Sequence, residues 1–227
     1  MVLAPTHDWL KPGELSEGDA AVANRRGKDY DPGMSTQPRT PTPRMTVEEF
    51  LAWAEGRPGR HELVRGEVIA QAAERAAHWE VKLATHVALL AAIKAKALPC
   101  HVVPDGATVR IDEATAYEPD AMVYRGPEAP PSALLVENPV IIVEVLSPST
   151  ERRDQGRKLA DYFRLPSVAH YLIIDPDEML VIHHQRRADD DILTRILREG
   201  TIALDPPGIE VKVAEIYGGG GYSPAST

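Results

Sequence analysis

The sequence predicts an α/β fold, in which helices alternate with β-strands around a hydrophobic core. Segment 139–146 is almost wholly apolar, as expected of a central strand covered on both faces. Apolar residues at helical spacing through 74–97 predict a long helix. Further strand-like segments lie before and after a second predicted helix at 151–165. This alternation favours the α/β class over all-α or all-β folds.

Ordered structure is predicted to begin with a short helix capped by Thr46. Thr46 and Glu49 form a capping box, in which each side chain accepts a free backbone N–H of the other residue. The short helix that follows is expected to end near Gly56. Strands are predicted at 61–65 and 67–70, with a turn between them.

Strands dominate the rest of the chain. Residues 100–103 and 107–111 flank Asp105-Gly106, which predicts a β-hairpin. Residues 147–150 offer N-caps for the second long helix. The remaining predicted strands share short apolar runs bounded by turn residues, and they cover 118–124, 139–146, 171–174, 179–183 and 193–197.

Three regions follow from composition along the chain. Residues 1–44 are rich in proline and lack periodicity, so we expect a disordered leader. Residues 45–217 form the predicted domain. Residues 218–227 begin with four glycines and are expected to be a disordered tail.

Composition bounds the class of protein. The 227 residues are 43% hydrophobic and 26% charged, which is typical of soluble globular domains. No apolar run approaches the roughly 18 residues of a membrane span. No secretory signal is visible and Cys100 is the sole cysteine, so we expect a cytoplasmic protein without a disulfide or cysteine zinc site.

The net charge of −9 argues against a protein that coats DNA electrostatically. It leaves a metal-dependent nuclease open, because divalent ions supply positive charge that meets the phosphate.

Two carboxylates stand where buried strands would not need them. Asp120 follows Pro119, and Glu144 lies within the apolar segment 139–146. Burial of an unpaired ionised carboxylate costs several kcal/mol, so a cation, a base or a proton must compensate the charge of Glu144. Two such acids on neighbouring strands, with a backbone carbonyl and waters, suit octahedral Mg²⁺. Pairing of Glu144 with a buried lysine or arginine is the structural alternative.

Further polar residues complete the candidate set. Glu62 opens the first predicted strand and is a candidate outer ligand or general base. Asp154, Lys158 and Tyr162 are spaced by four on the helix after the Glu144 strand, so they share one face. Lys158 is a candidate for positioning water or neutralising charge on a phosphate. An exposed Asp154–Lys158 pair is the alternative for this stripe.

Other chemistries find less support. No His-Glu-x-x-His motif, phosphate-binding loop, dinucleotide fingerprint or serine-hydrolase elbow occurs. His78 is placed on the long helix, where an ordinary helical role is favoured over a place beside the candidate site.

With these residues in view, the chain resembles the Uma-two restriction endonuclease family, within the PD-(D/E)XK nuclease superfamily. The resemblance extends over about residues 45–217. The segments that carry it keep one order along the chain and are 61–67, 118–123, 142–150, the stripe 154/158/162, and 171–176.

The resemblance implies a restriction-endonuclease-like mixed sheet flanked by helices, with additional antiparallel strands. It implies Asp120 and Glu144 as metal ligands and Glu62 as a supporting acid. The superfamily lysine is expected two residues after the second acid, where this chain has Leu146. In this family the lysine is thought to come from the next helix, which corresponds to Lys158.

The expected function is a Mg²⁺-dependent endonuclease that hydrolyses phosphodiester bonds in DNA, with Mn²⁺ as an alternative cofactor. Asp120, Glu144 and the Val145 carbonyl would hold the ion, and Glu62 and Lys158 would complete the catalytic set. We expect a homodimer and no membrane association. One rival is a catalytically silent nuclease fold that serves as a binding or assembly module, which Leu146 favours. Another is a hydrolase or lyase of a different substrate that uses Glu144 as a base.

Overall fold

The computed structural model describes residues 44–147 and 152–218, excluding the side chains of residues 152–154. These residues belong to one compact unit. The predicted leader and tail lie almost wholly outside them, so their boundaries remain predictions. The helices among the described residues are α1 (Val47–Ala54), α2 (Ala76–Ala95), α3 (Arg152–Tyr162) and α4 (Val213–Ile216).

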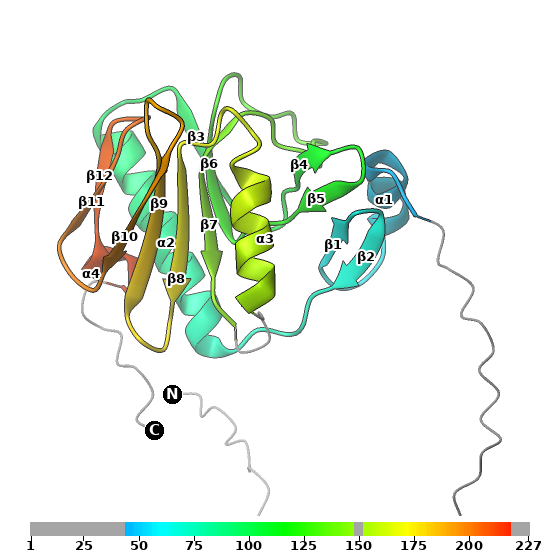
Figure 1. Ribbon diagram of the computed structural model, residues 1–227, viewed down its shortest axis with the longest axis horizontal. Helices are drawn as coiled ribbons and strands as arrows, with labels where there is room; N and C mark the ends of the chain where they lie inside the picture. Colours follow the sequence, from blue (N-terminus) through cyan, green and yellow to red (C-terminus); the bar gives the residue numbers. More distant parts are fainter. Residues whose placement is uncertain (1–43, 148–151, 219–227) are drawn as a thin grey trace, which may run out of the picture. The chain divides into compact units, whose positions relative to one another are not determined.

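The strands form three sheets within the described segments. One has six strands in the order β10-β9-β8-β7-β6-β3, one has four in the order β2-β1-β5-β4, and β11 and β12 pair alone (Figure 1). The strands are β1 (His61–Val64), β2 (Glu67–Ala70), β3 (Cys100–Pro104), β4 (Val109–Asp112), β5 (Thr115–Tyr117), β6 (Ala121–Arg125), β7 (Pro139–Val145), β8 (His170–Asp175), β9 (Leu180–Arg186), β10 (Ile192–Leu197), β11 (Thr201–Leu204) and β12 (Ile209–Lys212). The predicted α/β class with a mixed sheet is confirmed.

The strand β7 is the centre of the six-stranded sheet. Its residues are buried except Glu144, which is partly buried, as the apolar sequence predicts. It pairs antiparallel with β6 and parallel with β8. The helix α3 connects the two parallel strands, since parallel neighbours need a crossover connection.

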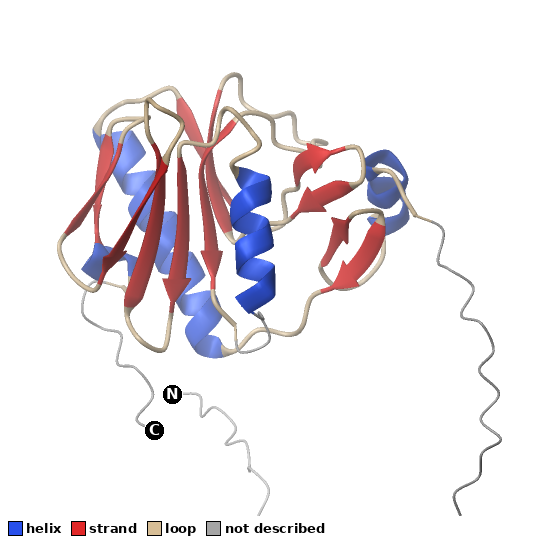
Figure 2. Ribbon diagram, in the orientation of Figure 1, coloured by secondary structure: helices blue, strands red, loops and turns tan. Residues whose placement is uncertain are grey.

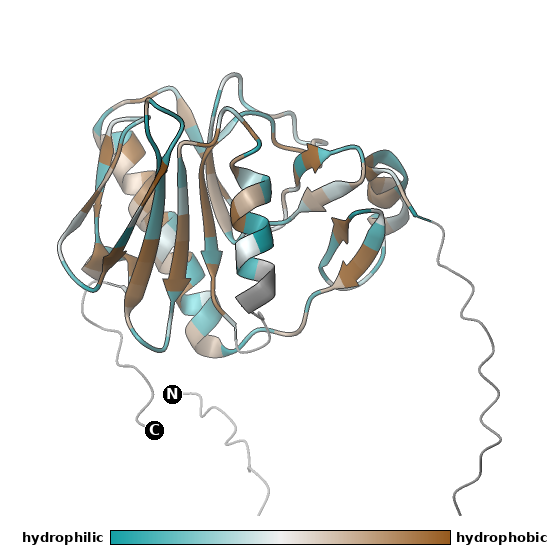
Figure 3. Cartoon of the chain, viewed as in Figure 1, coloured by the Kyte–Doolittle hydropathy of each residue, from teal (hydrophilic) through white to brown (hydrophobic). Residues whose placement is uncertain are grey.

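Helices cover both faces of this sheet (Figure 2). Figure 1 shows α3 on the near face and α2 on the far face. Ile141 and Val143 of β7 join the core beneath α2, whereas Ile142 joins the core beneath α3. This alternation follows from the two-residue period of a strand. Figure 3 shows the hydrophobic residues concentrated along the central strands β7 and β8.

The four-stranded sheet carries the N-terminal part of the domain. Thr46 caps α1 with the predicted capping box, and its hydroxyl accepts from the Glu49 N–H. The helix buries Val47 and Phe50 against Leu63 of β1. β1 and β2 pair as predicted.

The predicted hairpin at Asp105-Gly106 is wrong. β3 pairs with β6 at the edge of the six-stranded sheet, whereas β4 pairs with β5 in the four-stranded sheet. Gly106 does adopt a positive φ of 97°, so the turn exists. It carries the chain from β3 at the edge of the six-stranded sheet to β4 in the four-stranded sheet. The strands β5, β11 and β12 and the helix α4 were not predicted.

None of the helices in the described segments has the length and apolar character needed to cross a lipid bilayer.

Two buried histidines form a polar contact inside the six-stranded sheet. A ring N–H of His170 or His183 donates to the other ring across 2.9 Å between Nδ1 and Nε2. Burial lowers the pKa of His170 to about 4 and that of His183 to about 3. Both are therefore neutral in the folded protein at neutral pH.

Acidification is expected to destabilise the fold through this pair. Unfolded histidines bind protons below pH 6.5, whereas the folded ones stay neutral to about 4 and about 3. Stability is therefore retained above pH 6.5 and falls as pH decreases, by up to roughly 1.4 kcal/mol per pH unit for each histidine. Urea unfolding between about pH 7 and 5 measures this slope. The double variant H170N/H183N should have a shallower slope, and an equal slope would contradict the assignment.

Candidate active site

Asp120 and Glu144 meet at one edge of the six-stranded sheet. Asp120 directly precedes β6, and Glu144 lies near the end of β7. Because the two strands are antiparallel, with Ala121 paired to Val143, the start of β6 lies beside the end of β7. The Val145 N–H donates to Asp120 Oδ2 at 2.7 Å, so the β7 backbone fixes this carboxylate.

Lys158 of α3 lies between two acids from different sheets. Its Nζ donates to Glu62 Oε1 at 2.8 Å and to Glu144 Oε1 and Oε2 at 3.0 and 3.1 Å. The Tyr162 hydroxyl also donates to Glu144 Oε1, at 2.7 Å. Lys158 is 5% exposed, so it does not form a surface pair. We call these four residues the Lys158 cluster.

Burial sets the electrostatics of the Lys158 cluster. It raises the pKa of Glu144 to about 7, against the opposing effect of Lys158, and the charges of Asp120 and Glu62 add to the rise. Burial alone would lower the pKa of Lys158, but Glu144 and Glu62 more than offset it and raise that pKa. The ammonium therefore stays charged at neutral pH and can donate hydrogen bonds but cannot accept a proton.

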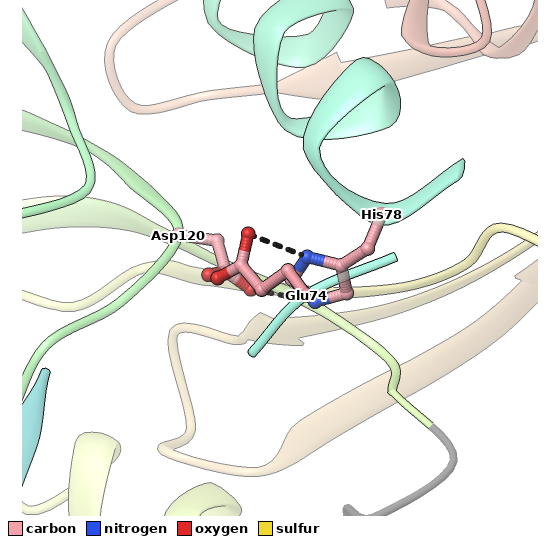
Figure 4. A group of neighbouring side chains, drawn as sticks. All are labelled: Glu74, His78 and Asp120. Atoms are coloured by element: carbon pink, nitrogen blue, oxygen red, sulfur yellow. Dashed lines mark ion pairs between the residues drawn. The ribbon is translucent and has the colours of Figure 1, made fainter. Parts of the chain in front are cut away.

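A second cluster, the His78 cluster, consists of Glu74, His78 and Asp120 (Figure 4). One potential ligand atom from each lies within 4.8 Å of the others. His78 Nδ1 is 3.2 Å from Glu74 Oε2, and His78 Nε2 is 3.8 Å from Asp120 Oδ2. His78 is 5% exposed and Asp120 is 6% exposed. The two carboxylates thus face opposite sides of one imidazole.

The hydrogen bond of His78 fixes its protonation on one side. Nε2 lies 2.7 Å from the Val145 carbonyl oxygen, which can only accept, so Nε2 carries a proton. Nδ1 is buried and makes no hydrogen bond of acceptable geometry, although a carboxylate oxygen lies 3.2 Å away. A lone pair facing a carboxylate is repulsive unless a positive charge lies between the two groups. The donor set therefore fits a cation.

Arg60 and Lys82 contact the other oxygens of the same carboxylates. Lys82 Nζ is 2.8 Å from Glu74 Oε1 and 3.1 Å from Asp120 Oδ1. Arg60 contacts the same two oxygens and lies 3.5 Å from Asp120 Oδ1. Glu74 Oε2 and Asp120 Oδ2 remain on the His78 side.

Charge around the His78 cluster is unbalanced. Four carboxylates pair with these two cations, and they are Glu74, Asp105, Glu118 and Asp120. Four negative and two positive groups leave two negative charges, without counting His78. Such an excess of carboxylates favours the binding of a cation.

One pocket contains the whole sequence-predicted set. Its lining includes Glu62, Asp120, Glu144, Val145 and Lys158. The roles of these residues are not tested by their positions, and they remain proposals. The side chain of Asp154, the remaining member of the predicted stripe, lies outside the described residues.

The sequence analysis missed Glu74, Lys82 and Arg60, and it gave His78 an ordinary helical role. A signal was present, because Glu74, His78 and Lys82 are spaced by four in the sequence. His78 and Lys82 lie in the first turns of α2, and Glu74 directly precedes its N-cap. The signal was weak because an acid and a base four apart usually form an exposed pair.

Comparisons with known proteins agree with this architecture. A structural neighbour, the crystal structure of "a putative nuclease belonging to DUF820" from Anabaena variabilis, has a TM-score of 0.60. The match covers 76% of this chain and 97% of that chain, and at 15% identity it shows the fold alone. Two uncharacterized proteins of Synechocystis sp. are 26% and 29% identical to this chain. They match 80% and 68% of it, and 96% and 89% of their own lengths.

A family profile matches most of the domain. The profile Uma2, described as "Putative restriction endonuclease", matches residues 47–214, from the first residue of α1 into α4. This range covers every described residue of both clusters. The chain therefore belongs to the Uma2 family of putative restriction endonucleases.

Proposed function

We propose that this protein is a divalent-metal-dependent endonuclease that hydrolyses phosphodiester bonds in DNA. The observation that carries the proposal is the convergence of Asp120, Glu144 and Lys158 on one pocket at the edge of the sheet. Asp120 directly precedes β6, Glu144 lies in β7 and Lys158 lies in α3, so the fold rather than local sequence assembles them. Family membership supports nuclease chemistry, and the family description supports DNA as the substrate.

The metal ligands we propose are the carboxylates of Asp120 and Glu144 and the carbonyl of Val145. His78 and Glu74 adjoin Asp120 and extend this set. His78 Nε2 lies next to the Val145 carbonyl oxygen. A bound divalent cation supplies positive charge that polarises a phosphoryl oxygen. Oxygen ligands suit Mg²⁺, and an imidazole nitrogen among them also suits Mn²⁺.

Lys158 acts as a charged donor in this proposal. Its raised pKa excludes it as a general base, so it orients water or neutralises charge that develops on the phosphate. Glu62 holds the ammonium beside Glu144 through its 2.8 Å contact, which makes Glu62 a positioning residue. Tyr162 fixes the Glu144 carboxylate from the same helix.

A catalytically silent binding module is the second candidate. The observation that favours it is that Lys158 contacts both oxygens of Glu144, which competes with metal ligation. The two candidates differ in metal binding, because a silent module has no need of a divalent ion.

The first prediction concerns Asp120. D120N should lose at least about 100-fold of Mg²⁺- or Mn²⁺-dependent cleavage of DNA, because it removes the negative charge of a proposed metal ligand. Cleavage of plasmid and linear duplex DNA measures this loss. Asp191 is exposed between β9 and β10, so D191N is a matched control that should cut normally. Equal cleavage by D120N and D191N would remove the proposal.

The second prediction separates Lys158 from metal binding. K158M should lose cleavage by about 100-fold or more while calorimetry still detects Mn²⁺ binding. It should also destabilise the fold by roughly 3–5 kcal/mol, because two buried carboxylates lose their counter-charge. K96M changes an exposed lysine and is the control. A K158M protein that cuts DNA at the normal rate would contradict the assigned role.

The third prediction concerns His78. If His78 ligates the ion, electron spin-echo spectra of bound Mn²⁺ should show nitrogen coupling. H78Q should remove this coupling and weaken Mn²⁺ binding by about tenfold. H101Q alters a histidine at the other end of the sheet and should leave the coupling intact. Nitrogen coupling that persists in H78Q would exclude His78 as a ligand.

A further inference from the structure

The helix α2 is apolar on both of its faces. One face packs on the six-stranded sheet and buries Val81, Leu89 and Ile93. The opposite face carries Trp79, Leu83 and Val87, which are 51%, 63% and 55% exposed. A surface helix normally presents polar residues outward, so this face lacks the usual character of a solvated surface.

These three side chains form one stripe, the α2 stripe. They follow each other at intervals of four, which places them along one side of the helix. Among the described residues, they are three of the seven large hydrophobic side chains that are exposed. Clustered exposed apolar residues indicate an interaction surface, whereas scattered ones are ordinary.

Charges on the outer face of α2 are sparse and symmetric. Glu80 and Lys94 are its exposed charged residues. Neither has a salt bridge within the described part of the chain. Val87 lies midway between them, seven residues after Glu80 and seven before Lys94.

We propose that a second copy of this chain docks on the α2 stripe, with the two α2 helices antiparallel and the twofold axis at Val87. In this register Glu80 of each copy faces Lys94 of the other. Leu83 faces Ala91, and Trp79 faces Ala95, so large side chains meet small ones. Such self-complementarity is what a twofold interface requires, because the same patch serves on both subunits.

The register also sets the distance between the candidate active sites of the two copies. His78 lies nine residues from Val87, at the N-terminal end of α2. With a rise of 1.5 Å per residue in each copy, the two His78 residues lie roughly 27 Å apart along the helix direction. The interface itself does not depend on the nuclease proposal, since it follows from the α2 stripe and its charges.

Analytical ultracentrifugation of the full chain tests whether the α2 stripe mediates dimerisation. A single helix pair buries less than the ~800 Å² per partner of a standard interface, so we expect dimers with micromolar affinity. L83D should weaken dimerisation by about 30-fold or more, because it buries a charge against the partner helix. Ile196 of β10 is 69% exposed, and I196D is the matched control that should dimerise normally. A chain that stays monomeric at about 0.1 mM, or dimers that tolerate L83D, would overturn the proposal.

Charge exchange tests the register and the identity of the partner. E80K and K94E should each weaken the dimer by roughly tenfold, since each places like charges together twice. The double variant E80K/K94E should restore wild-type affinity, because it recreates both pairs in reverse. A parallel pair or a different partner would give no such rescue. Both substitutions are at exposed positions, so this test holds even if L83D impairs folding.

Discussion

The buried ammonium of Lys158 joins the two main sheets of this protein. Glu62 comes from β1 of the four-stranded sheet, Glu144 comes from β7 of the six-stranded sheet, and both contact Lys158 within 3.0 Å. The helix α3 that carries Lys158 also receives a hydrogen bond from Tyr117 of β5, at Asp161. Apolar packing also joins the sheets, since Val64 and Val109 share a buried cluster with Ile142. At the pocket, buried charged side chains add to this contact. Replacing such a buried network by apolar side chains is often neutral or stabilising, so stability alone does not account for it.

Asp120 is likewise the centre of a buried network of charged side chains. Its two oxygens point to different partners, with Arg60 and Lys82 on one side and the Val145 N–H and His78 on the other. Buried charge of this density is costly unless it is compensated. The local excess of carboxylates and the unsatisfied Nδ1 of His78 both point to a cation as the missing compensation. The helix α2 links this region to the α2 stripe, because its first turns supply His78 and Lys82 and its outer face supplies the stripe.

Much of the fold was predictable because local signals agreed with tertiary structure. The capping box at Thr46, the apolar run of β7 and the period of α2 each depend on neighbouring residues alone. The hairpin at Asp105-Gly106 failed because turn geometry fixes a turn but not the partners of its flanking strands. Short strands such as β5 were missed since three residues carry too little pattern.

The sequence by itself determined the class of fold, the family resemblance and the acids Asp120, Glu144 and Glu62. Their signal is chemical, since a carboxylate in an apolar strand needs an explanation wherever the strand lies. Tertiary structure alone decided which groups those acids meet. Lys158 is 14 residues from Glu144 and 96 from Glu62. The β-α-β connection brings Lys158 to Glu144, and the packing of the four-stranded sheet brings Glu62 to both. The same holds for Glu74 and His78, because only the packing of α2 on the sheet brings them to Asp120. Distances between residues remote in sequence depend on the packing of whole elements, which no local pattern encodes.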